Sequence, residues 1–586
     1  MAADSSTSDD AESGPLLRSY GYGAHDSTDA STSDDKEQEL HDSIGYKRLR
    51  RGFCAYSIAG EVFAIVSASL FLPVVLETYA RQHGVLSTGD RSLPCPDSGS
   101  SGDLEADARC IVQLGGAWID TASFSLMVYS ASVAVQALTV ISMGGIADDA
   151  HARHRLLITF AFCGSGLCIC FLALAAGSSL WPLAAVLALG ANVTYGASNV
   201  CMNAYLPDLG RRAPAVLRAQ AELVRARTGY STSRRRMSST SSNTLLSSSQ
   251  VLAHATDAYI HARARATGEV SSRAIAYGYA AGISVLAALL PVMSWLASRS
   301  SGNDATGPLR FAIAVSGTWW LVGTVFAAIW LRPDQEPSPA TGRKLSYTAS
   351  IAQGWQGLGR MLGEWRRLPQ AFVFLGAWFL LSDCFATITS TAVLFAKTSL
   401  NLPTSSLIII SILSPLAGLF GALIVPRLQH SSTFAHLGLT THRTLMILVA
   451  SATLIPLWGL LALRTAWQMY ALSCVFGFIY GSFQAYARSC FSDLIPSAKA
   501  AQFFGLYSIT DKSSSFLGPL LVAVVTNQTG EIRYAFWVIL SLMVISLPVL
   551  ARVDVKAGSA DAERYENEVK ALAMEEDVLP DEVDDL

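Results

Sequence analysis

Charged residues are scarce in this sequence, and the residue patterns that common enzymes use are missing. Asp, Glu, Lys and Arg make up 15% of the 586 residues, whereas an ordinary soluble domain has about 25%. We find no phosphate-binding glycine loop, no nucleophile elbow and no Cys/His cluster with zinc spacing. We therefore expect a protein that is not an enzyme and needs no cofactor or metal. The net charge of −3 gives no reason to expect a nucleic-acid partner.

The ten cysteines form no CxxC pair, and most lie in apolar segments, where a free cysteine behaves as a small hydrophobic residue. Cys95 and Cys110 differ because they share a polar loop. They would form a disulfide if that loop faces an oxidising compartment. The sequence leaves this open.

Long apolar runs with almost no charge dominate the rest of the chain, of which 51% is hydrophobic. A membrane-spanning helix needs about 20 apolar residues. The sequence therefore predicts an all-α integral membrane protein in a lipid bilayer. Its twelve expected spans are 53–77, 121–147, 156–177, 180–206, 273–297, 309–331, 370–397, 405–426, 443–463, 467–492, 501–526 and 533–551.

Lys and Arg predict the orientation, because they are enriched in cytoplasmic loops. An even number of spans places both termini on one side, and a basic cluster at 47–51 precedes the first span. We expect both termini in the cytoplasm. The sequon at Asn527 would then lie at the luminal end of span eleven, as a candidate for glycosylation. The basic residues assigned to the cytoplasmic side are Arg153, Arg155, Arg427, Arg443, Arg488 and Lys499.

The chain repeats itself in two halves. Tyr195 in span four and Tyr480 in span ten are each followed by polar residues at the same offsets. Glu61 in span one and Asp383 in span seven also lie at matching places. A duplicated six-helix unit explains both matches and is the architecture of major facilitator transporters. The matched residues after the two tyrosines are Gly196, Asn199, Asn203 and Asp208 in one half, and Gly481, Gln484, Arg488 and Asp493 in the other.

These observations divide the chain into two six-helix bundles with polar segments around them. The bundles are 52–331 and 369–552. We expect a cytoplasmic Ser/Arg-rich insert within the first bundle and expect it to be disordered. The polar segments are an acidic, disordered tail at 1–51, the insert at 209–270, a linker at 332–368 and an acidic tail at 553–586.

The loop between spans two and three resembles the G-x-x-x-D…R-[KR] loop of the major facilitator superfamily. It reads Gly144-Gly145-Ile146-Ala147-Asp148, followed by Arg153, His154 and Arg155. The resemblance implies that Asp148 meets a helix N-terminus of the neighbouring bundle and helps to close one gate, with Arg153 and Arg155 beside it.

Polar residues inside the spans are the candidates for a transport site, because a charge at bilayer depth needs a cavity or a partner. Glu61 and Asp383 would bind a substrate amine or a proton; the alternative is a hydrogen-bonded carboxylate near the cytoplasmic mouth. Structural pairing and substrate contact both remain open for Asp511 and Lys512. Five further residues would hydrogen-bond a zwitterion or simply join helices: Tyr195, Asn199, Asn203, Tyr480 and Gln484.

The N-terminal tail contains a candidate sorting signal. Glu12 with Leu16 and Leu17 fits the acidic dileucine form, [DE]xxxL[LI]. Sorting adaptor proteins bind this form on cytoplasmic tails and route cargo to lysosome-like compartments. Such adaptors are the protein partners that we expect.

Several stretches resemble the fungal autophagy-related protein 22 family of vacuolar amino-acid effluxers. The similarity covers nearly all of 46–552 outside the insert and is most specific at 508–516. One departure is Gly52-Phe53-Cys54, where the family has Gly-Trp-Tyr. The stretches are 56–63, 71–73 with 76–77, 271–279, 382–383, 387–395, 480–484 and 508–516.

This resemblance implies a vacuole-membrane protein that exports leucine and other neutral amino acids to the cytosol by alternating access. The cargo would come from autophagic degradation and would sustain protein synthesis in nitrogen starvation. Two alternatives stay open. One is a non-transporting scaffold or nutrient receptor on the same fold, and the other is a carrier of another small solute, such as a sugar or a drug.

Overall fold

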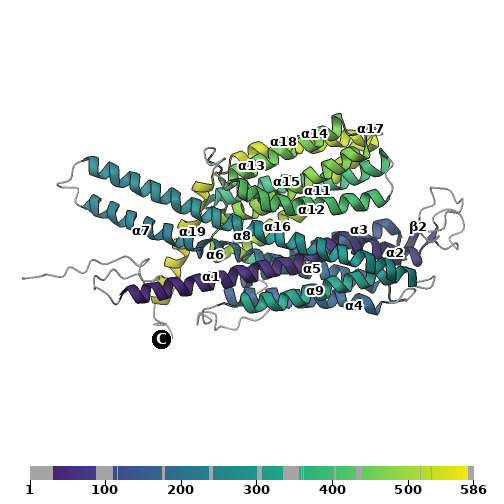
Figure 1. The fold of residues 1–586 in the computed structure, drawn as a ribbon, viewed down its shortest axis with the longest axis horizontal. Coiled ribbons are helices and arrows are strands. Elements are labelled where there is room, and N and C mark those ends of the chain that lie inside the picture. The colour runs from purple at the N-terminus through teal and green to yellow at the C-terminus, as the bar shows by residue number, and fades with distance from the viewer. Residues whose placement is uncertain are drawn as a thin grey trace, which may run out of the picture. The chain divides into compact units, whose positions relative to one another are not determined.

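The computed structural model describes 31–86, 95, 110–114, 117–174, 179–235, 242–299, 306–333, 355–357, 359–360, 362–400, 404–429, 438–514, 517–529 and 531–578. The chain divides into two compact units, Met1–Gly45 and Tyr46–Leu586. The second unit contains the membrane helices (Figure 1). Apart from the first helix, which begins at Ser31 in the first unit, everything below concerns the second unit.

Helices make up almost all of the described part of this unit, in two successive sets. The N-terminal set is α1 (Ser31–Val62), the π-helix η2 (Phe63–Phe71), α2 (Leu72–Gln82), α3 (Thr121–Ala147), α4 (Ala150–Cys170), η3 (Phe171–Ala173), α5 (Leu183–Asn203), α6 (Leu206–Arg211), α7 (Pro214–Arg235), α8 (Ser242–Arg299) and α9 (Gly307–Trp330). The C-terminal set is η5 (Glu364–Arg366), α11 (Pro369–Thr398), α12 (Thr404–Gln429), α13 (Thr441–Ala452), α14 (Leu454–Leu461), α15 (Ala466–Leu494), η7 (Ser497–Lys499), α16 (Ala500–Ser514), α17 (Leu517–Thr529), η8 (Ile532–Tyr534), α18 (Ala535–Ala551) and α19 (Val555–Val578).

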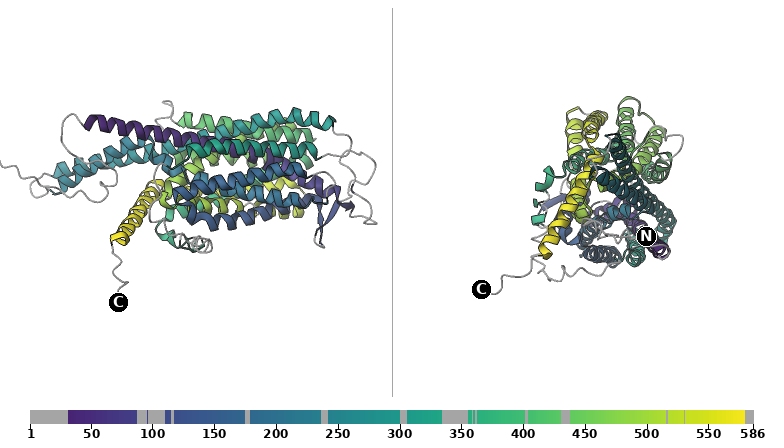
Figure 2. Two further views of the ribbon diagram at one scale, coloured as in Figure 1. Left: turned by 90° about the horizontal axis from the view of Figure 1, so that it is seen from below. Right: turned by 90° about the vertical axis from the view of Figure 1, so that its left-hand side faces the viewer.

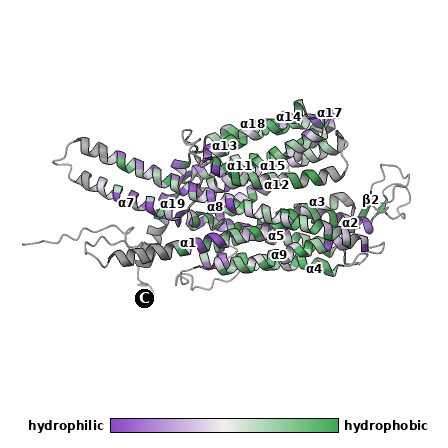
Figure 3. Ribbon diagram, in the orientation of Figure 1, coloured by the Kyte–Doolittle hydropathy of each residue, from purple (hydrophilic) through white to green (hydrophobic). Residues whose placement is uncertain are grey.

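Ten helices of the described residues are long and apolar enough to cross a membrane. In the ribbon of Figure 3, the helices of the bundle carry many hydrophobic residues, whereas α7 and α19 carry more hydrophilic ones. The two other expected spans, 467–492 and 501–526, correspond to α15 and to α16 with α17. The first has 29 residues but carries more polar groups, and the second is divided between two shorter helices.

The two sets of helices meet along several pairs that come from different halves. Helix α3 packs against α16, and α8 packs against both α12 and α15. Figure 2 gives two further views of this bundle. Smaller contacts join α5 to α16, α6 to α15 and α8 to α13.

The expectation of a disordered insert at 209–270 is wrong for its described residues. Helix α7 and the N-terminal part of α8 pack against each other and project from the end of the bundle opposite β2 (Figures 1 and 2). The signal was a helical spacing of small and apolar residues, which outweighs the Ser/Arg-rich composition. The buried positions are Val216, Ala219 and Leu223 on α7, and Ala255 and Tyr259 on α8.

The segments assigned to the two terminal tails both contain helical residues. Helix α1 begins at Ser31, inside the segment 1–51 that the composition predicted to be disordered. The acidic segment 553–586 contains α19, which packs against α11 and α15. Ala562 and Tyr565 of α19 lie three residues apart and are buried, so one face of the helix is part of the core. We call this end of the bundle the α19 end.

The opposite end carries a small antiparallel sheet in the order β1-β2-β3. Its strands are β1 (Val85–Leu86), β2 (Cys110–Leu114) and β3 (Ala117–Asp120). Leu86 pairs with Cys110, and Val112 pairs with Ile119. A disulfide joins Cys95 to Cys110, which settles the pairing that the sequence left open. We call this the sheet end.

Glycines allow α12 and α15 to pack at backbone distance. Gly477 and Gly481 form a G-x-x-x-G pattern on α15, and a Cβ added at Gly477 would lie 2.0 Å from the carbonyl oxygen of Ser414 on α12. A Cβ at Gly481 would lie 2.4 Å from the carbonyl oxygen of Gly418. Close approach of this kind provides the van der Waals contact that holds helices together in lipid.

Replacing Gly477 with alanine should separate these two helices. The added methyl group meets a backbone carbonyl that cannot rotate away, and such overpacking costs about 1–3 kcal/mol. We expect Gly477→Ala to lower the thermal unfolding temperature of the purified protein in detergent. Gly376→Ala on α11 is the matched control, because a Cβ there meets nothing within 4 Å. Equal unfolding temperatures for the two variants would contradict this packing.

Candidate functional site

The predicted site residues separate into three groups. One group lies between the two halves, around Glu61 and Arg488. A second lies within the C-terminal half, around Asp383 and Asp511. The third lies at the α19 end, where Asp148 and Arg153 meet neighbouring helices.

Equivalent positions of the two halves meet in the first group. Asn203 on α5 and Arg488 on α15 each lie eight residues after the matched tyrosines, Tyr195 and Tyr480. The Nη1 atom of Arg488 donates a hydrogen bond of 3.1 Å to Oδ1 of Asn203. Both side chains are buried. Arg488, which the charge pattern assigned to the cytoplasmic side of the membrane, is therefore a buried α15 residue that joins the halves.

Glu61 faces the same interface from the last turn of α1. The α-helix changes to a π-helix directly after this turn. Residues Phe63–Phe71 form the π-helix η2, and such segments are frequent at functional sites. Gly278 of α8 makes room for the acid, since a Cβ added there would lie 2.4 Å from Cγ of Glu61. The charge of Arg488 interacts electrostatically with Glu61, so these two charges belong to one site.

Tyrosines surround this pair of charges. Tyr195 on α5 and Tyr279 on α8 both interact electrostatically with Glu61 and with Arg488. Tyr480 on α15 stacks on Phe476 and accepts a hydrogen bond of 2.9 Å from Nε2 of Gln484. Asn199 is half-buried on α5. The structure therefore brings most of the predicted zwitterion-binding residues to one interface.

Asp383 lies apart from this group, although its position in the sequence matches that of Glu61. Its Oδ1 accepts a hydrogen bond of 2.9 Å from the main-chain N–H of Gly518, in the first turn of α17. A carboxylate at a helix N-terminus is stabilised by the unpaired N–H groups and the helix dipole. Of the two interpretations that the sequence left open, this geometry favours the structural one for Asp383.

Asp511 is also bonded within the C-terminal half. The hydroxyl of Ser382 donates to the carboxylate of Asp511 and lies 3.2 Å from its main-chain oxygen. The side chain of Lys512 lies outside the described part. Asn527 has no described side chain either, and Glu12, Leu16 and Leu17 fall outside the described residues, so glycosylation and sorting stay predictions.

Asp148 meets the neighbouring half at the α19 end. Its Oδ1 accepts hydrogen bonds of 2.8 Å and 3.4 Å from the main-chain N–H groups of Ala501 and Gln502, in the first turn of α16. Burial raises the pKa of Asp148 to about 7, although these bonds and the charge of Arg153 lower it. The contact is the one that the loop motif implies.

Arg153 holds the same loop against α5 and α6. Its guanidinium donates to the carbonyl oxygen of Ala204 at 2.8 Å and to Oδ2 of Asp208 at 3.1 Å, and it lies 4.5 Å from the ring centroid of Tyr205. Arg155 is exposed and takes part in none of these contacts. The two basic residues of the motif therefore have different environments.

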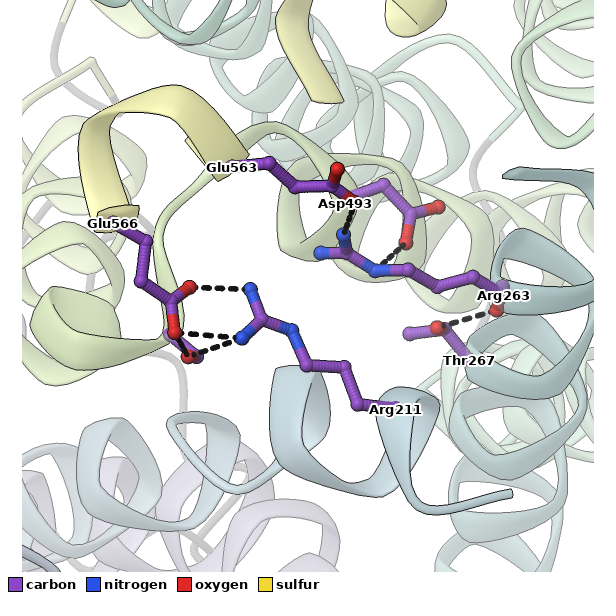
Figure 4. A network of polar contacts seen from close by, with 7 residues as sticks. Arg211, Arg263, Thr267, Asp493, Glu563 and Glu566 are labelled. Carbon is purple, nitrogen blue, oxygen red and sulfur yellow. Dashed lines mark hydrogen bonds and ion pairs between the residues drawn. The ribbon is translucent and has the colours of Figure 1, made fainter. Parts of the chain in front are cut away.

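Helix α19 joins the two halves through charged side chains that the sequence did not single out (Figure 4). Glu566 of α19 accepts two hydrogen bonds from Arg211 of α6, at 2.8 and 2.5 Å, and a third from Ser497 at 3.0 Å. Tyr565 donates to Glu364 of the linker at 2.6 Å, and Lys499 pairs with that carboxylate at 3.1 Å. One helix thus ties the N-terminal half, the linker and the C-terminal half together.

The insert breaks the symmetry between the halves at this end. Asp208 and Asp493 are equivalent in sequence, yet Asp208 pairs with Arg153 of its own half. Asp493 lies 3.7 Å from Arg263 of α8, which belongs to the other half. Arg263 is 1% exposed and also lies 3.7 Å from Glu563 of α19. The amphipathic spacing of α7 and α8 was the signal that would have placed Arg263 inside the protein.

The geometry provides polar binding and inter-half contacts. No cluster of His, Cys, Asp or Glu in the described ranges is suited to hold a metal ion. These sites contain buried charges. Such charges can change partners when the two halves move between two arrangements.

Comparison with known proteins gives the same architecture and a family. The model of the family described as "Vacuole effluxer Atg22 like" matches residues 46–563. Autophagy-related protein 22 of Pyricularia oryzae is 33% identical, over 95% of this chain and 82% of that protein. Its counterpart in Gibberella zeae is 35% identical, over 92% and 84%.

Solved structures of major facilitator transporters share the fold. The human organic anion transporter MFSD10 aligns with a TM-score of 0.54 and 13% identity, over 86% of this chain and 99% of that chain. The transporter FucP in its outward conformation aligns with a TM-score of 0.53 and 9% identity, over 87% and 99%. The expected all-α membrane fold with major facilitator architecture is confirmed.

The contact of Asp148 with α16 should depend on pH. The buried carboxyl has its pKa near 7, whereas an Asp exposed by separation of the halves has one near about 4. Between these two pH values, Asp148 therefore binds more protons when the contact is closed than when it is open. The equilibrium constant for closing rises as the pH falls, by at most about tenfold per pH unit.

Hydrogen exchange of the amides of Ala501 and Gln502, corrected for intrinsic rates, measures this equilibrium. We expect stronger protection at pH 5 than at pH 8 in the wild type. Asp148→Asn keeps an acceptor oxygen without a titrating group, so its protection should be independent of pH. The same pH dependence in both proteins would exclude Asp148 as the titrating group.

Removing the charge of Glu566 should release α19. Arg211 is mostly buried, with 24% of its side chain exposed, and Glu566→Gln leaves its charge without compensation. Such a loss costs about 1–3 kcal/mol. We expect faster tryptic cleavage within α19. Glu568→Gln is the control, because Glu568 and its partner Arg367 are more than half exposed and 3.9 Å apart, where ion pairs contribute little. Equal cleavage rates would contradict a clamp by Glu566.

Proposed function

Because this chain belongs to the Atg22-like family of vacuole effluxers and has the major facilitator fold, we propose that it exports neutral amino acids such as leucine from the vacuole to the cytosol. The amino acids would be products of autophagic degradation, and their export would sustain protein synthesis in nitrogen starvation. The two halves would expose one central site to either side of the membrane in turn.

The observation that carries this proposal is the buried polar interface between the halves. Glu61 lies in a helical segment that is long and apolar enough to span a membrane, and Arg488 is buried on α15. A charge inside a membrane protein is costly unless it serves a cavity or a partner. The hydrogen bond between Arg488 and Asn203 joins equivalent positions of the two halves. Motion of one half against the other would break and remake this bond.

The orientation is part of the proposal, with the α19 end and both termini in the cytoplasm. The Cys95–Cys110 disulfide lies at the sheet end, and disulfides persist in oxidising compartments. Basic residues such as Arg153, Arg211 and Lys499 lie at the α19 end, in agreement with the enrichment of Lys and Arg in cytoplasmic loops. The sheet end would then face the vacuole lumen.

Reconstitution into liposomes tests the function. We expect labelled leucine to leave liposomes that contain the protein faster than it leaves protein-free liposomes. Unlabelled leucine on the outside should accelerate this efflux by exchange. Labelled glucose should not move. Glucose flux without leucine flux would identify a carrier of another solute, and correctly folded protein without any flux would favour the scaffold alternative.

A further inference from the structure

Glu61 and Arg488 are opposite charges that share one site without joining each other. Among the described residues, Glu61 makes no ion pair or hydrogen bond, although it interacts electrostatically with Arg488. Opposite charges in a low-dielectric interior attract strongly and normally pair directly. A pair held apart in this way is suited to a ligand that carries both charges.

The helix backbones hold the side chains of this site in place. A Cβ at Gly278 would meet Cγ of Glu61 at 2.4 Å, and one at Gly418 would meet the ring of Tyr279 at 2.8 Å. The ring of Tyr195 lies 3.3 Å from a Cβ added at Gly60. Glycines on α1, α8 and α12 therefore provide the space that the acid and the two tyrosines occupy.

Arg488 has hydrogen-bonding capacity that the protein does not use. Its side chain is more than nine-tenths buried, with 8% exposed, and its Nε atom has no hydrogen-bond partner among the described residues. Nη1 donates to the neutral amide oxygen of Asn203. A carboxylate accepts two parallel bonds from a guanidinium and binds it about twice as strongly as a neutral acceptor does.

We propose that Arg488 binds the α-carboxylate of the transported amino acid and that Glu61 binds its α-ammonium group. Tyr195 and Tyr279 lie beside these two charged residues. This assignment rests on the proposed function and names the chemical class that the site selects, a zwitterion with one ammonium and one carboxylate. The substrate carboxylate competes with Asn203 for Arg488. Substrate binding therefore weakens a hydrogen bond that joins the halves, which couples binding to their movement.

Ligands that lack one charge test this assignment directly. Leucinamide has no carboxylate, and 4-methylpentanoate has no ammonium group. Binding is measured as the ligand-dependent rise in unfolding temperature of the purified full-length chain, so the test does not require transport. We expect leucine to stabilise the wild type and both analogues to bind about 10- to 100-fold more weakly, as for the loss of one charged hydrogen-bonding partner.

The variants then show which residue binds which group. Arg488→Gln should weaken leucine binding about 10- to 100-fold and leave leucinamide binding unchanged. Glu61→Gln should weaken leucine binding and leave 4-methylpentanoate binding unchanged. Glu77→Gln is the control, because Glu77 forms a half-buried pair with Arg81 on its own helix, α2. This variant should keep the wild-type preference.

The outcomes separate this inference from the proposed function. If wild-type protein binds and transports leucine but both variants keep its preference for leucine over the analogues, the function stands and the assignment is wrong. If wild-type protein neither binds nor transports any amino acid, the function itself is wrong. If either residue has only a structural role, its variant should bind all three ligands more weakly and to the same extent. That result would also overturn the assignment.

Discussion

The structure depends on one constraint: polar and charged groups inside a lipid-facing bundle must find partners within the protein. No water is present at bilayer depth to solvate them. Asp383 accepts a hydrogen bond from an N–H group at the start of α17. Asp148 accepts one from the start of α16, and Arg488 donates one to Asn203 of the other half. Two of these three bonds run between the halves, so the need to satisfy polar groups also holds the halves together.

This constraint acts differently at the two ends of the bundle. The Cys95–Cys110 disulfide at the sheet end lies within the N-terminal half and does not link the two halves. The α19 end is closed by ion pairs and hydrogen bonds, with Glu566 and Tyr565 of α19 at their centre. Ion pairs can exchange partners, whereas a disulfide cannot without redox chemistry. The ion pairs that join the halves at the α19 end can therefore exchange partners when the halves move.

The duplicated halves no longer have equivalent environments. Asp208 and Asp493 occupy the same place in the repeat, but the insert supplies Arg263 as the partner of Asp493. Glu61 and Asp383 diverge in the same way, one facing the interface and the other capping a helix. Among the described residues, equivalent positions of the repeat therefore make different contacts in the two halves.

The sequence by itself determined the class of protein, its spans and its repeat. Apolar runs of membrane length and the equal offsets after Tyr195 and Tyr480 depend on local composition and spacing, which a linear chain displays directly. Only the tertiary structure decided which polar residues meet. Arg488 was assigned to the cytoplasmic side, and the insert that contains α7 was expected to be disordered. The segment of α19 was expected only to be an acidic tail, and Asp383 was treated as the equal of Glu61. The spacing of small and apolar residues would have predicted α7. The partners of Arg488 and Asp383 lie 285 and 135 residues away in the sequence, and local spacing cannot reveal them.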